Sequence, residues 1–316
     1  MKIAVLFPGQ GSQYLGMAQE FVHSKKECAG LMEMAENTCD LKLQELCGQG
    51  PMEELTRGSN LQPAITIANL ICWQAFLDET QGEIEVSSFA GHSLGEYSAL
   101  YAAGVINAED AMKLVSKRGA LMEREGVKNP GGMRAVLGLD IDAVEKIIYD
   151  YSGDGVVTAA NHNTPQQVVI SGSLAGLDGV TSVAEEQGAK VIPLNVSVAN
   201  HSPLVADAVP DFAEFMADTD FNLPKIPVYF NVTAGRETDP KKMKGIMASQ
   251  IASKVRWYEI ITAMVDDGVD TFIEVGPKSV LKGMMRKITP KGTKVTSLQF
   301  DCPDSLEKCL QKLREQ

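Results

Sequence analysis

EIEVSSFAGHSLGEYSALYAA, residues 83–103, is the stretch that decides the fold. Its pattern predicts a strand over 83–90 and a helix over 96–103, joined by a sharp turn. Gly91 and Gly95 flank Ser93, and so tight a turn needs residues with little or no side chain on either side of the serine. Gly-x-Ser-x-Gly between a strand and a helix is typical of a nucleophile elbow, which presents a serine hydroxyl at the carboxyl end of a sheet.

Strands and helices alternate on both sides of this stretch. The first strand is an apolar run that ends at the turn Pro8-Gly9-Gln10-Gly11. Further along the chain, Pro63 is expected in the first turn of a buried helix, where a missing N–H is tolerated. This order predicts a parallel sheet with crossover helices. The further strands and helices expected for this sheet are 2–7, 14–22, 60–77, 110–125, 228–232 and 271–275.

The pattern changes between residues 127 and 197. Strand, helix, strand, strand, helix and strand follow one another there, which is the ferredoxin-like order. The six segments are 133–139, 141–150, 156–160, 167–171, 176–187 and 190–196, with a turn at 161–165 between the two central strands. The sequence therefore predicts an α/β fold. We expect residues 1–126 and 198–316 to form an α/β-hydrolase-like main domain with a parallel sheet, and residues 127–197 to form a smaller ferredoxin-like α+β domain.

Composition limits the classes of function. The net charge of −12 argues against binding to nucleic acid or to an anionic membrane. No apolar run reaches the roughly 20 residues that a membrane-spanning helix needs. The six cysteines show no CxxC pair and no zinc spacing, so we expect reduced thiols and no metal site. These features indicate a soluble, cytoplasmic protein, for which a monomer is the default expectation.

A serine nucleophile needs a base, and the chain has only four histidines. His92 adjoins Ser93, but its side chain leaves the turn in another direction, which favours a supporting role. His162 lies in the small-domain turn and is expected to be structural. His201 follows the small domain where the chain returns to the main sheet, a place that suits a cleft between domains. A single loop histidine is more often a surface or core residue, so the residues alone leave its role open.

Several motifs occur in order along nearly the whole chain. They are FPGQGSQ at 7–13, GHSLGEY at 91–97, Arg118, NHNTPQQVVISG at 161–172, His201, Gln250 and EVGP at 274–277. With them the sequence resembles the malonyl-CoA:acyl-carrier-protein transacylases of type II fatty acid synthesis. It is also similar to the acyltransferase domains of polyketide synthases. The resemblance implies transfer of a malonyl group from malonyl-CoA to acyl carrier protein through a malonyl-serine, with malonyl-CoA as a substrate and no bound cofactor.

The resemblance also implies roles for individual residues. Ser93 attacks the thioester and His201 takes its proton. A main-chain carbonyl near Gln250, rather than an aspartate, orients the histidine. The backbone N–H groups of Gln10 and Leu94 form the oxyanion hole.

Further positions concern support and selectivity. His92 and Asn161 are implied as supporting residues. Arg118 is implied to pair with the malonyl carboxylate, whereas the residues alone leave open an exposed residue in a basic helix cluster. Many malonyl-selective members have an aromatic residue where this chain has Asn200, so the strictness of malonyl selection stays open. Members of the methylmalonyl type often carry Gln after the nucleophile, so Leu94 at that position is implied to favour an unbranched substrate.

A basic face is the remaining feature with a functional hypothesis. Lys278, Lys282 and Arg286 follow Gly276-Pro277 at intervals of four, and Lys287 is adjacent. If this stretch is helical, the three share one side and could dock an acidic carrier protein, although a solvated helix face is equally consistent. Three alternatives to a fatty-acid enzyme stay open: a discrete trans-acting acyltransferase of a polyketide synthase, a serine esterase, and a catalytically silent subunit that binds carrier protein.

Overall fold

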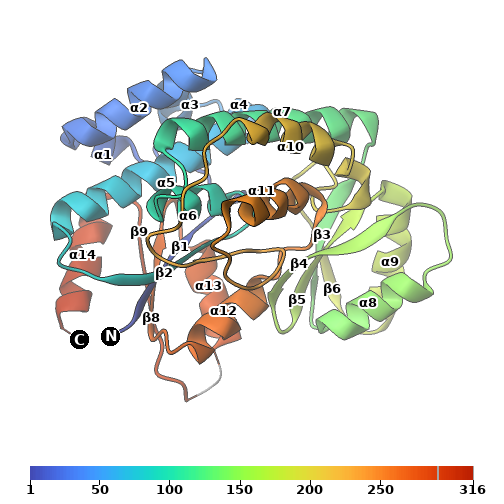
Figure 1. Ribbon diagram of the computed structural model, residues 1–316. Coiled ribbons are helices and arrows are strands. Elements are labelled where there is room, and N and C mark those ends of the chain that lie inside the picture. The colour runs from blue at the N-terminus through green and yellow to red at the C-terminus, as the bar shows by residue number, and fades with distance from the viewer. Residues whose placement is uncertain (290–291, 316) are drawn as a thin grey trace.

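The computed structural model describes residues 1–289 and 292–315 and contains two sheets (Figure 1). The larger sheet has five parallel strands in the order β7-β2-β1-β8-β9. Its strands are β1 (Ile3–Phe7), β2 (Val86–Gly91), β7 (Val228–Tyr229), β8 (Thr271–Val275) and β9 (Thr296–Phe300). This sheet confirms the expected parallel α/β main domain.

Helices cover both faces of the large sheet, with α5, α6 and α7 on one side and α12 and α13 on the other (Figure 1). The helices before the small domain are α1 (Gln19–Ser24), α2 (Lys26–Cys39), α3 (Leu43–Gln49), α4 (Met52–Thr56), α5 (Gly58–Thr80), α6 (Gly95–Ala102) and α7 (Ala108–Lys128). Those after it are η1 (Pro203–Val205), α10 (Ala208–Ala217), α11 (Pro240–Ser249), η2 (Gln250–Ala252), α12 (Trp257–Asp266), α13 (Val280–Ile288) and α14 (Pro303–Arg314).

Strand β1 shows why the sheet is covered on both faces. Every residue of Ile3–Phe7 is buried. Successive side chains of a strand point to opposite faces, so Ile3, Val5 and Phe7 join the core beneath α5, and Ala4 and Leu6 join the core beneath α12 and α13. Full burial of one such large aliphatic side chain contributes about 1.5–3 kcal/mol. The continuous apolar run is thus the signature of a strand with two buried faces.

The small domain has the ferredoxin-like order β3 (Gly132–Leu137), α8 (Ile141–Asp150), β4 (Val157–Thr164), β5 (Gln167–Gly172), α9 (Leu174–Glu186) and β6 (Lys190–Pro193). Its strands form an antiparallel sheet in the order β4-β5-β3-β6. The predicted boundary at residue 126 falls in the last turn of α7, which runs to Lys128.

Three local expectations are wrong. The helix expected from Tyr14 begins only at Gln19, because Gly16 and Ala18 have positive φ. Pro63 lies in the second turn of α5, not the first, because that helix begins at Gly58. The turn expected at 161–165 is largely strand, since β4 continues to Thr164.

The cysteines and the helix lengths are two further features on which the sequence makes a prediction. All six cysteines are free. Over residues 1–289 and 292–315, no helix is both long enough and apolar enough to cross a membrane.

Candidate active site

Ser93 stands on a strained turn between β2 and α6. Its φ is +50°, a left-handed conformation that few residues with a side chain adopt. Glycines make the turn possible: a Cβ on Gly91 would lie 1.9 Å from the carbonyl carbon of Gly95, and one on Gly95 would lie 2.1 Å from the carbonyl oxygen of Phe7. The end of β1 is thus packed directly under the elbow, which raises the serine hydroxyl above the sheet.

His201 meets Ser93 from the segment that follows the small domain. Its Nε2 lies 2.7 Å from Ser93 Oγ. Its Nδ1 faces two main-chain carbonyl oxygens, Gln250 O at 2.9 Å and Ser253 O at 3.0 Å. Because carbonyls only accept, Nδ1 carries the hydrogen and Nε2 is free to accept a proton from the serine. Burial lowers the pKa of His201 to about 3, with a further contribution from the charge of Arg118, so the ring is neutral and ready to act as a base.

Arg118 brings a positive charge to the same point from helix α7. The side chain is 2% exposed, so the alternative of a solvent-exposed helix residue is wrong. Its Nη2 donates to Ser93 Oγ at 3.1 Å and to Gln250 Oε1 at 3.0 Å, and its Nη1 donates to Gln62 Oε1 at 2.8 Å. Burial lowers the pKa of Arg118 from its usual value.

The guanidinium of Arg118 has neutral hydrogen-bond partners only. Within the described chain, no carboxylate forms an ion pair with it, and its Nε has no hydrogen-bond partner. A buried, hydrogen-bonded cation without a counter-ion is costly to hold. The arrangement suits an anionic group supplied by a ligand, and a carboxylate can accept two parallel hydrogen bonds from a guanidinium.

The backbone groups expected to form an oxyanion hole lie on two adjoining loops. A Cβ on Gly9 would come within 2.4 Å of His92 O and 3.5 Å of Leu94 N, so the loop after β1 touches the elbow. Among residues 1–289 and 292–315, no acceptor takes a hydrogen bond from the N–H of Gln10 or of Leu94. Leu94 also immediately precedes α6, where the helix N-terminus favours negative charge. Two free donors beside Ser93 can therefore stabilise an oxyanion.

His92 and Asn161 tie the elbow and the cleft to the small domain. His92 Nε2 lies 2.8 Å from Asn163 Oδ1, and its ring meets Trp257 edge-on at 5.3 Å. The backbone of Asn161 bridges to Val255, while its side-chain Oδ1 is buried without a partner at the cleft. His162 is buried in β4, as a structural residue would be, with Nδ1 3.3 Å from the carboxylate of Glu259.

The cleft between the two domains contains Ser93 and His201 in its wall. It measures about 430 Å³ and is lined from the main domain by the loop at Gly9–Gly11 and from the small domain by residues such as Met133. Asn200 also lines it, 8% exposed, with a side-chain Oδ1 that has no partner in the described chain. A small polar side chain thus occupies the position before the histidine.

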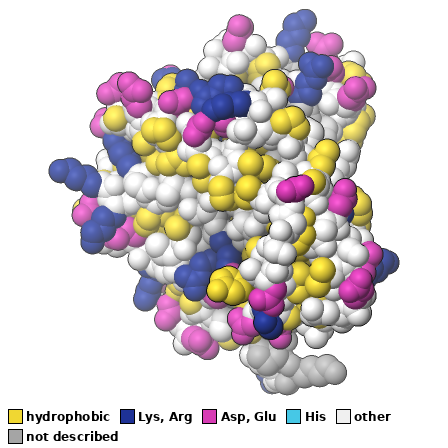
Figure 2. Space-filling model, turned by 90° about the vertical axis from the view of Figure 1, so that its right-hand side faces the viewer, with side chains coloured by type: hydrophobic (Ala, Val, Ile, Leu, Met, Phe, Trp, Pro, Cys, Tyr) yellow, Lys and Arg dark blue, Asp and Glu magenta, His cyan; other side chains and the backbone are white. Residues whose placement is uncertain are grey.

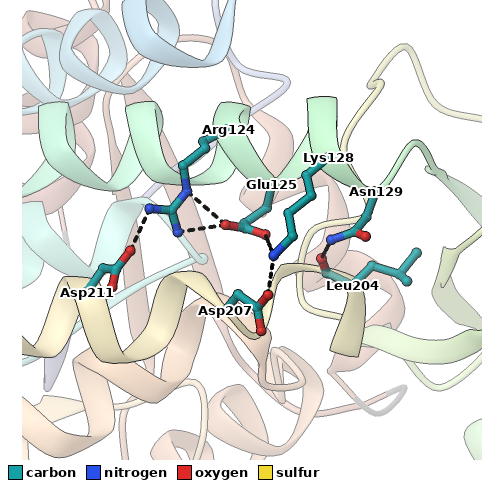
Figure 3. A network of polar contacts seen from close by, with 7 residues as sticks. All are labelled: Arg124, Glu125, Lys128, Asn129, Leu204, Asp207 and Asp211. Atoms are coloured by element: carbon teal, nitrogen blue, oxygen red, sulfur yellow. Dashed lines mark hydrogen bonds and ion pairs between the residues drawn. The ribbon is translucent and has the colours of Figure 1, made fainter.

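A polar network fastens helix α7 to the segment that follows His201 (Figure 3). Arg124 bonds to Glu125 and Asp211, and Lys128 bonds to Glu125 and Asp207. Exposed ion pairs of this kind contribute little individually, but Glu125 is 1% exposed and joins both cations. The network connects the helix that carries Arg118 to the start of α10, close in sequence to His201.

Other residues of the site are not evident from the sequence. Asn231 accepts from the N–H of Ser93 at 2.6 Å and donates to Gly91 O at 2.8 Å. Gln62 holds the guanidinium of Arg118, and Glu96 lies buried behind the elbow. No group of three or more histidine, cysteine, aspartate or glutamate side chains able to hold a metal ion occurs in the part of the chain that the structure describes.

Known proteins resemble this chain over its whole length. A family described as acyl transferase domain matches residues 5–300. The malonyl CoA-acyl carrier protein transacylase of Bacillus subtilis (strain 168) is 37% identical over 317 residues, which are 100% of this chain and 98% of that protein. The protein of the same name from Staphylococcus aureus (strain MRSA252) is 38% identical over 300 residues, 94% of this chain and 96% of that protein.

Solved structures agree with the sequence relatives. The malonyl CoA-acyl carrier protein transacylase of Clostridium perfringens has a TM-score of 0.93 and 36% identity, covering 100% of this chain and 98% of that one. A malonyl-transacylase solved in complex with its type II polyketide synthase acyl carrier protein has a TM-score of 0.93 and 32% identity, covering 99% of this chain and 100% of that one.

Proposed function

The chain belongs to the acyl transferase family, and from this we propose that Ser93 carries a malonyl group between two thiols. The protein is an acyltransferase that moves malonyl from malonyl-CoA to acyl carrier protein. The single observation that carries the residue-level proposal is that an imidazole nitrogen of His201 and a guanidinium nitrogen of Arg118 both lie within hydrogen-bond distance of Ser93 Oγ, at 2.7 Å and 3.1 Å.

The first half-reaction forms the malonyl-enzyme. Ser93 Oγ attacks the thioester carbonyl carbon of malonyl-CoA while its proton passes to His201 Nε2. The carbonyl oxygen becomes an oxyanion that accepts hydrogen bonds from the N–H groups of Gln10 and Leu94. The loss of one such donor typically costs on the order of 3 kcal/mol of transition-state stabilisation. The C–S bond then breaks, and the departing coenzyme A sulfur takes the proton from His201.

The second half-reaction repeats these steps in reverse. The pantetheine thiol of the carrier protein gives its proton to His201 Nε2 and attacks the malonyl ester carbon. The oxyanion forms again in the same hole, and the bond to Ser93 Oγ breaks as the oxygen recovers the proton. Because His201 is neutral when each nucleophile arrives, one imidazole serves as base and then as acid in both halves.

Arg118 supplies the selection for malonyl. A malonyl group carries a free carboxylate that can pair with the guanidinium through two hydrogen bonds, and an acetyl group does not. Binding of an acetyl group leaves the buried cation without its counter-ion, which disfavours that substrate. The same pair holds the malonyl ester in a fixed orientation away from water until the carrier thiol arrives.

Docking of the carrier protein needs a local basic face, since this chain carries a net charge of −12. Figure 2 shows acidic and basic side chains interspersed with hydrophobic ones on the small-domain side, without one dominant basic field. Lys282 and Arg286 lie one turn apart on α13. Lys278 precedes that helix, so the expectation of three residues on one helical face is wrong for it, but it lines the mouth of the cleft. We propose that these three cations meet the acidic carrier.

The remaining expectations stay predictions. They are supply of malonyl units to fatty acid elongation rather than to a polyketide synthase, the monomeric state, cytoplasmic residence and the lack of a bound cofactor. The selectivity that Asn200 sets between malonyl and branched malonyl groups also stays a prediction.

Intact-protein mass spectrometry after mixing with malonyl-CoA tests the proposed function. A malonyl adduct that is absent from Ser93→Ala and that disappears when holo acyl carrier protein is added supports it. Rapid release of free malonate without a carrier would indicate a serine esterase instead. No adduct and no turnover would indicate a silent carrier-binding subunit.

A further inference from the structure

Glu96 is a fully buried carboxyl group for which the mechanism above has no use. It lies in the first turn of α6, three residues after the nucleophile, and is 0% exposed. No lysine or arginine of the described chain forms an ion pair with it. A buried carboxylate without a paired cation costs several kcal/mol unless hydrogen bonds compensate it. Its hydrogen-bond partners should therefore explain its presence.

Both carboxylate oxygens of Glu96 hold residues that in turn hold the catalytic groups. Oε1 accepts from the backbone N–H of Asn231 at 2.6 Å, and Oε2 accepts from the side-chain amide of Gln250. Asn231 accepts from the N–H of Ser93. Gln250 donates to Ser93 O at 2.8 Å and accepts from Arg118 at 3.0 Å. The carboxylate of Glu96 is thus one residue removed from both the nucleophile and the guanidinium.

The direction of each hydrogen bond around Gln250 is fixed by chemistry. Arg118 can only donate, so it must face the amide oxygen of Gln250. Ser93 O can only accept, so it must face the amide nitrogen. The remaining hydrogen of that nitrogen points at Glu96 Oε2, and a backbone N–H points at Oε1. Both oxygens of Glu96 must therefore accept, which a carboxylate does and a carboxamide cannot.

We propose that Glu96 is a positioning residue that fixes the orientation of the Gln250 amide and thereby aims the guanidinium of Arg118 at the carboxylate of the substrate. This inference rests on the proposed function, because it concerns recognition of the malonyl carboxylate. Glu96 acts on the guanidinium through Gln250 and contacts neither substrate. Through its hydrogen bond to the backbone N–H of Asn231, Glu96 also supports the backbone of Ser93, because the side chain of Asn231 accepts from the Ser93 N–H.

The charges near Glu96 decide the conditions of the test. Burial raises the pKa of Glu96 to about 8, against the opposing effects of its two donors and of Arg118 on α7. Tyr97 on the same helix is neutral, because burial raises its pKa well above the usual value. Burial also keeps His201 and His92 neutral by lowering the pKa of each. Strands β1 and β2, which pack against α6, contain no titratable side chain. Assays at about pH 9 therefore keep Glu96 as the carboxylate.

Glu96→Gln isolates the link to Arg118. The amide oxygen of the new side chain can still accept from Asn231 N–H, so support of the Ser93 backbone is retained. Its nitrogen meets the nitrogen of Gln250, donor against donor. Relief by rotation of the Gln250 amide would turn a nitrogen toward Arg118 and an oxygen toward Ser93 O. Rotation removes an acceptor from the guanidinium, and without rotation the repulsion between the two nitrogens displaces the Gln250 amide that holds it; both outcomes disturb the aim of Arg118.

The measurement is the rate of acylation of Ser93 by malonyl-CoA and by acetyl-CoA, followed by quenched intact-mass spectrometry. For Glu96→Gln we expect the ratio of malonyl to acetyl kcat/KM to fall roughly tenfold or more, the effect of one lost hydrogen bond to a buried charge. Glu274→Gln is the matched control. Glu274 is equally buried on β8, and its carboxylate accepts from the backbone N–H groups of Leu281 and Lys282 instead. Its substitution should leave the ratio unchanged.

Equal losses of both rates in Glu96→Gln, with the ratio preserved, would overturn the proposal and leave Glu96 a structural residue. If Glu96→Gln fails to fold, Gln250→Met tests the same link, because it removes the amide and keeps the main-chain carbonyl that orients His201. An unchanged ratio in Gln250→Met would equally overturn it. Failure of the proposed function itself is distinguishable, since the wild-type protein would then form no malonyl-serine.

Discussion

Replacement of Arg118 by alanine should change which acyl group the protein accepts. In the structure the guanidinium makes three hydrogen bonds to Gln62, Gln250 and Ser93 and has no anionic partner in the described chain. The malonyl carboxylate is therefore the group that compensates its charge. Removal of one member of a buried ion pair costs about 3–5 kcal/mol. At about 1.4 kcal/mol for each factor of ten, malonyl kcat/KM should fall roughly 100- to 1,000-fold or more.

In Arg118→Ala, kcat/KM for acetyl-CoA should rise or stay unchanged, whereas kcat/KM for malonyl-CoA falls. An acetyl group gives Arg118 no counter-ion, so loss of the cation removes a penalty for this substrate. The assay compares acylation of Ser93 by the two thioesters in the wild type, in Arg118→Ala and in Lys117→Ala. Lys117 is the matched control, because its Nζ lies over the ring of Phe215, 5.4 Å from the ring centre, and outside the site. Parallel losses for malonyl and acetyl in Arg118→Ala would refute the reasoning, because the arginine would then serve the serine rather than the substrate.

Three further outcomes follow from the geometry. Gly95→Ala places a Cβ 2.1 Å from Phe7 O and should lower the free energy of unfolding by more than about 3 kcal/mol in a denaturant titration; wild-type stability would contradict the packing of the elbow. Burial holds the pKa of His201 near 3, so the imidazole is the neutral base at every higher pH, and the rate of malonyl-enzyme formation should show no acid limb near pH 6.5. An inflection there that is lost in His201→Gln would contradict this. Lys282→Glu with Arg286→Glu should raise KM for carrier protein and spare that for malonyl-CoA, and unchanged carrier kinetics would remove the docking face.

The elbow and the small domain could be predicted because their signals are local. Gly91 and Gly95 indicate a turn that only glycine permits. In the structure, a Cβ added to either glycine would lie about 2 Å from a neighbouring backbone atom. The alternation of strand and helix lengths between 127 and 197 likewise reports a pattern within one short stretch. The full motif at 91–97 also contains Glu96, but a motif letter does not reveal what its side chain holds.

The supporting residues could not be predicted because their contacts cross the chain. Asn231 meets Ser93 across 138 positions, and Arg118 meets Gln250 across 132. The sequence pattern also does not predict strand β9. Residues Thr296–Phe300 form an edge strand that is only partly apolar, and they follow a polar segment. Lys278 shows the opposite error: regular spacing suggested a helix, but its positive φ places it before α13 begins. Periodicity predicts an element, and the backbone at its ends decides which residues belong to it.

The most direct test of the central claim is to follow one malonyl group through the protein. Isolated malonyl-enzyme, digested and sequenced by tandem mass spectrometry, should carry the group on Ser93 alone. The same preparation, mixed with holo acyl carrier protein and quenched, should deliver it to the pantetheine thiol. An adduct on another residue, or a malonyl-Ser93 that the carrier thiol cannot discharge, would contradict the account.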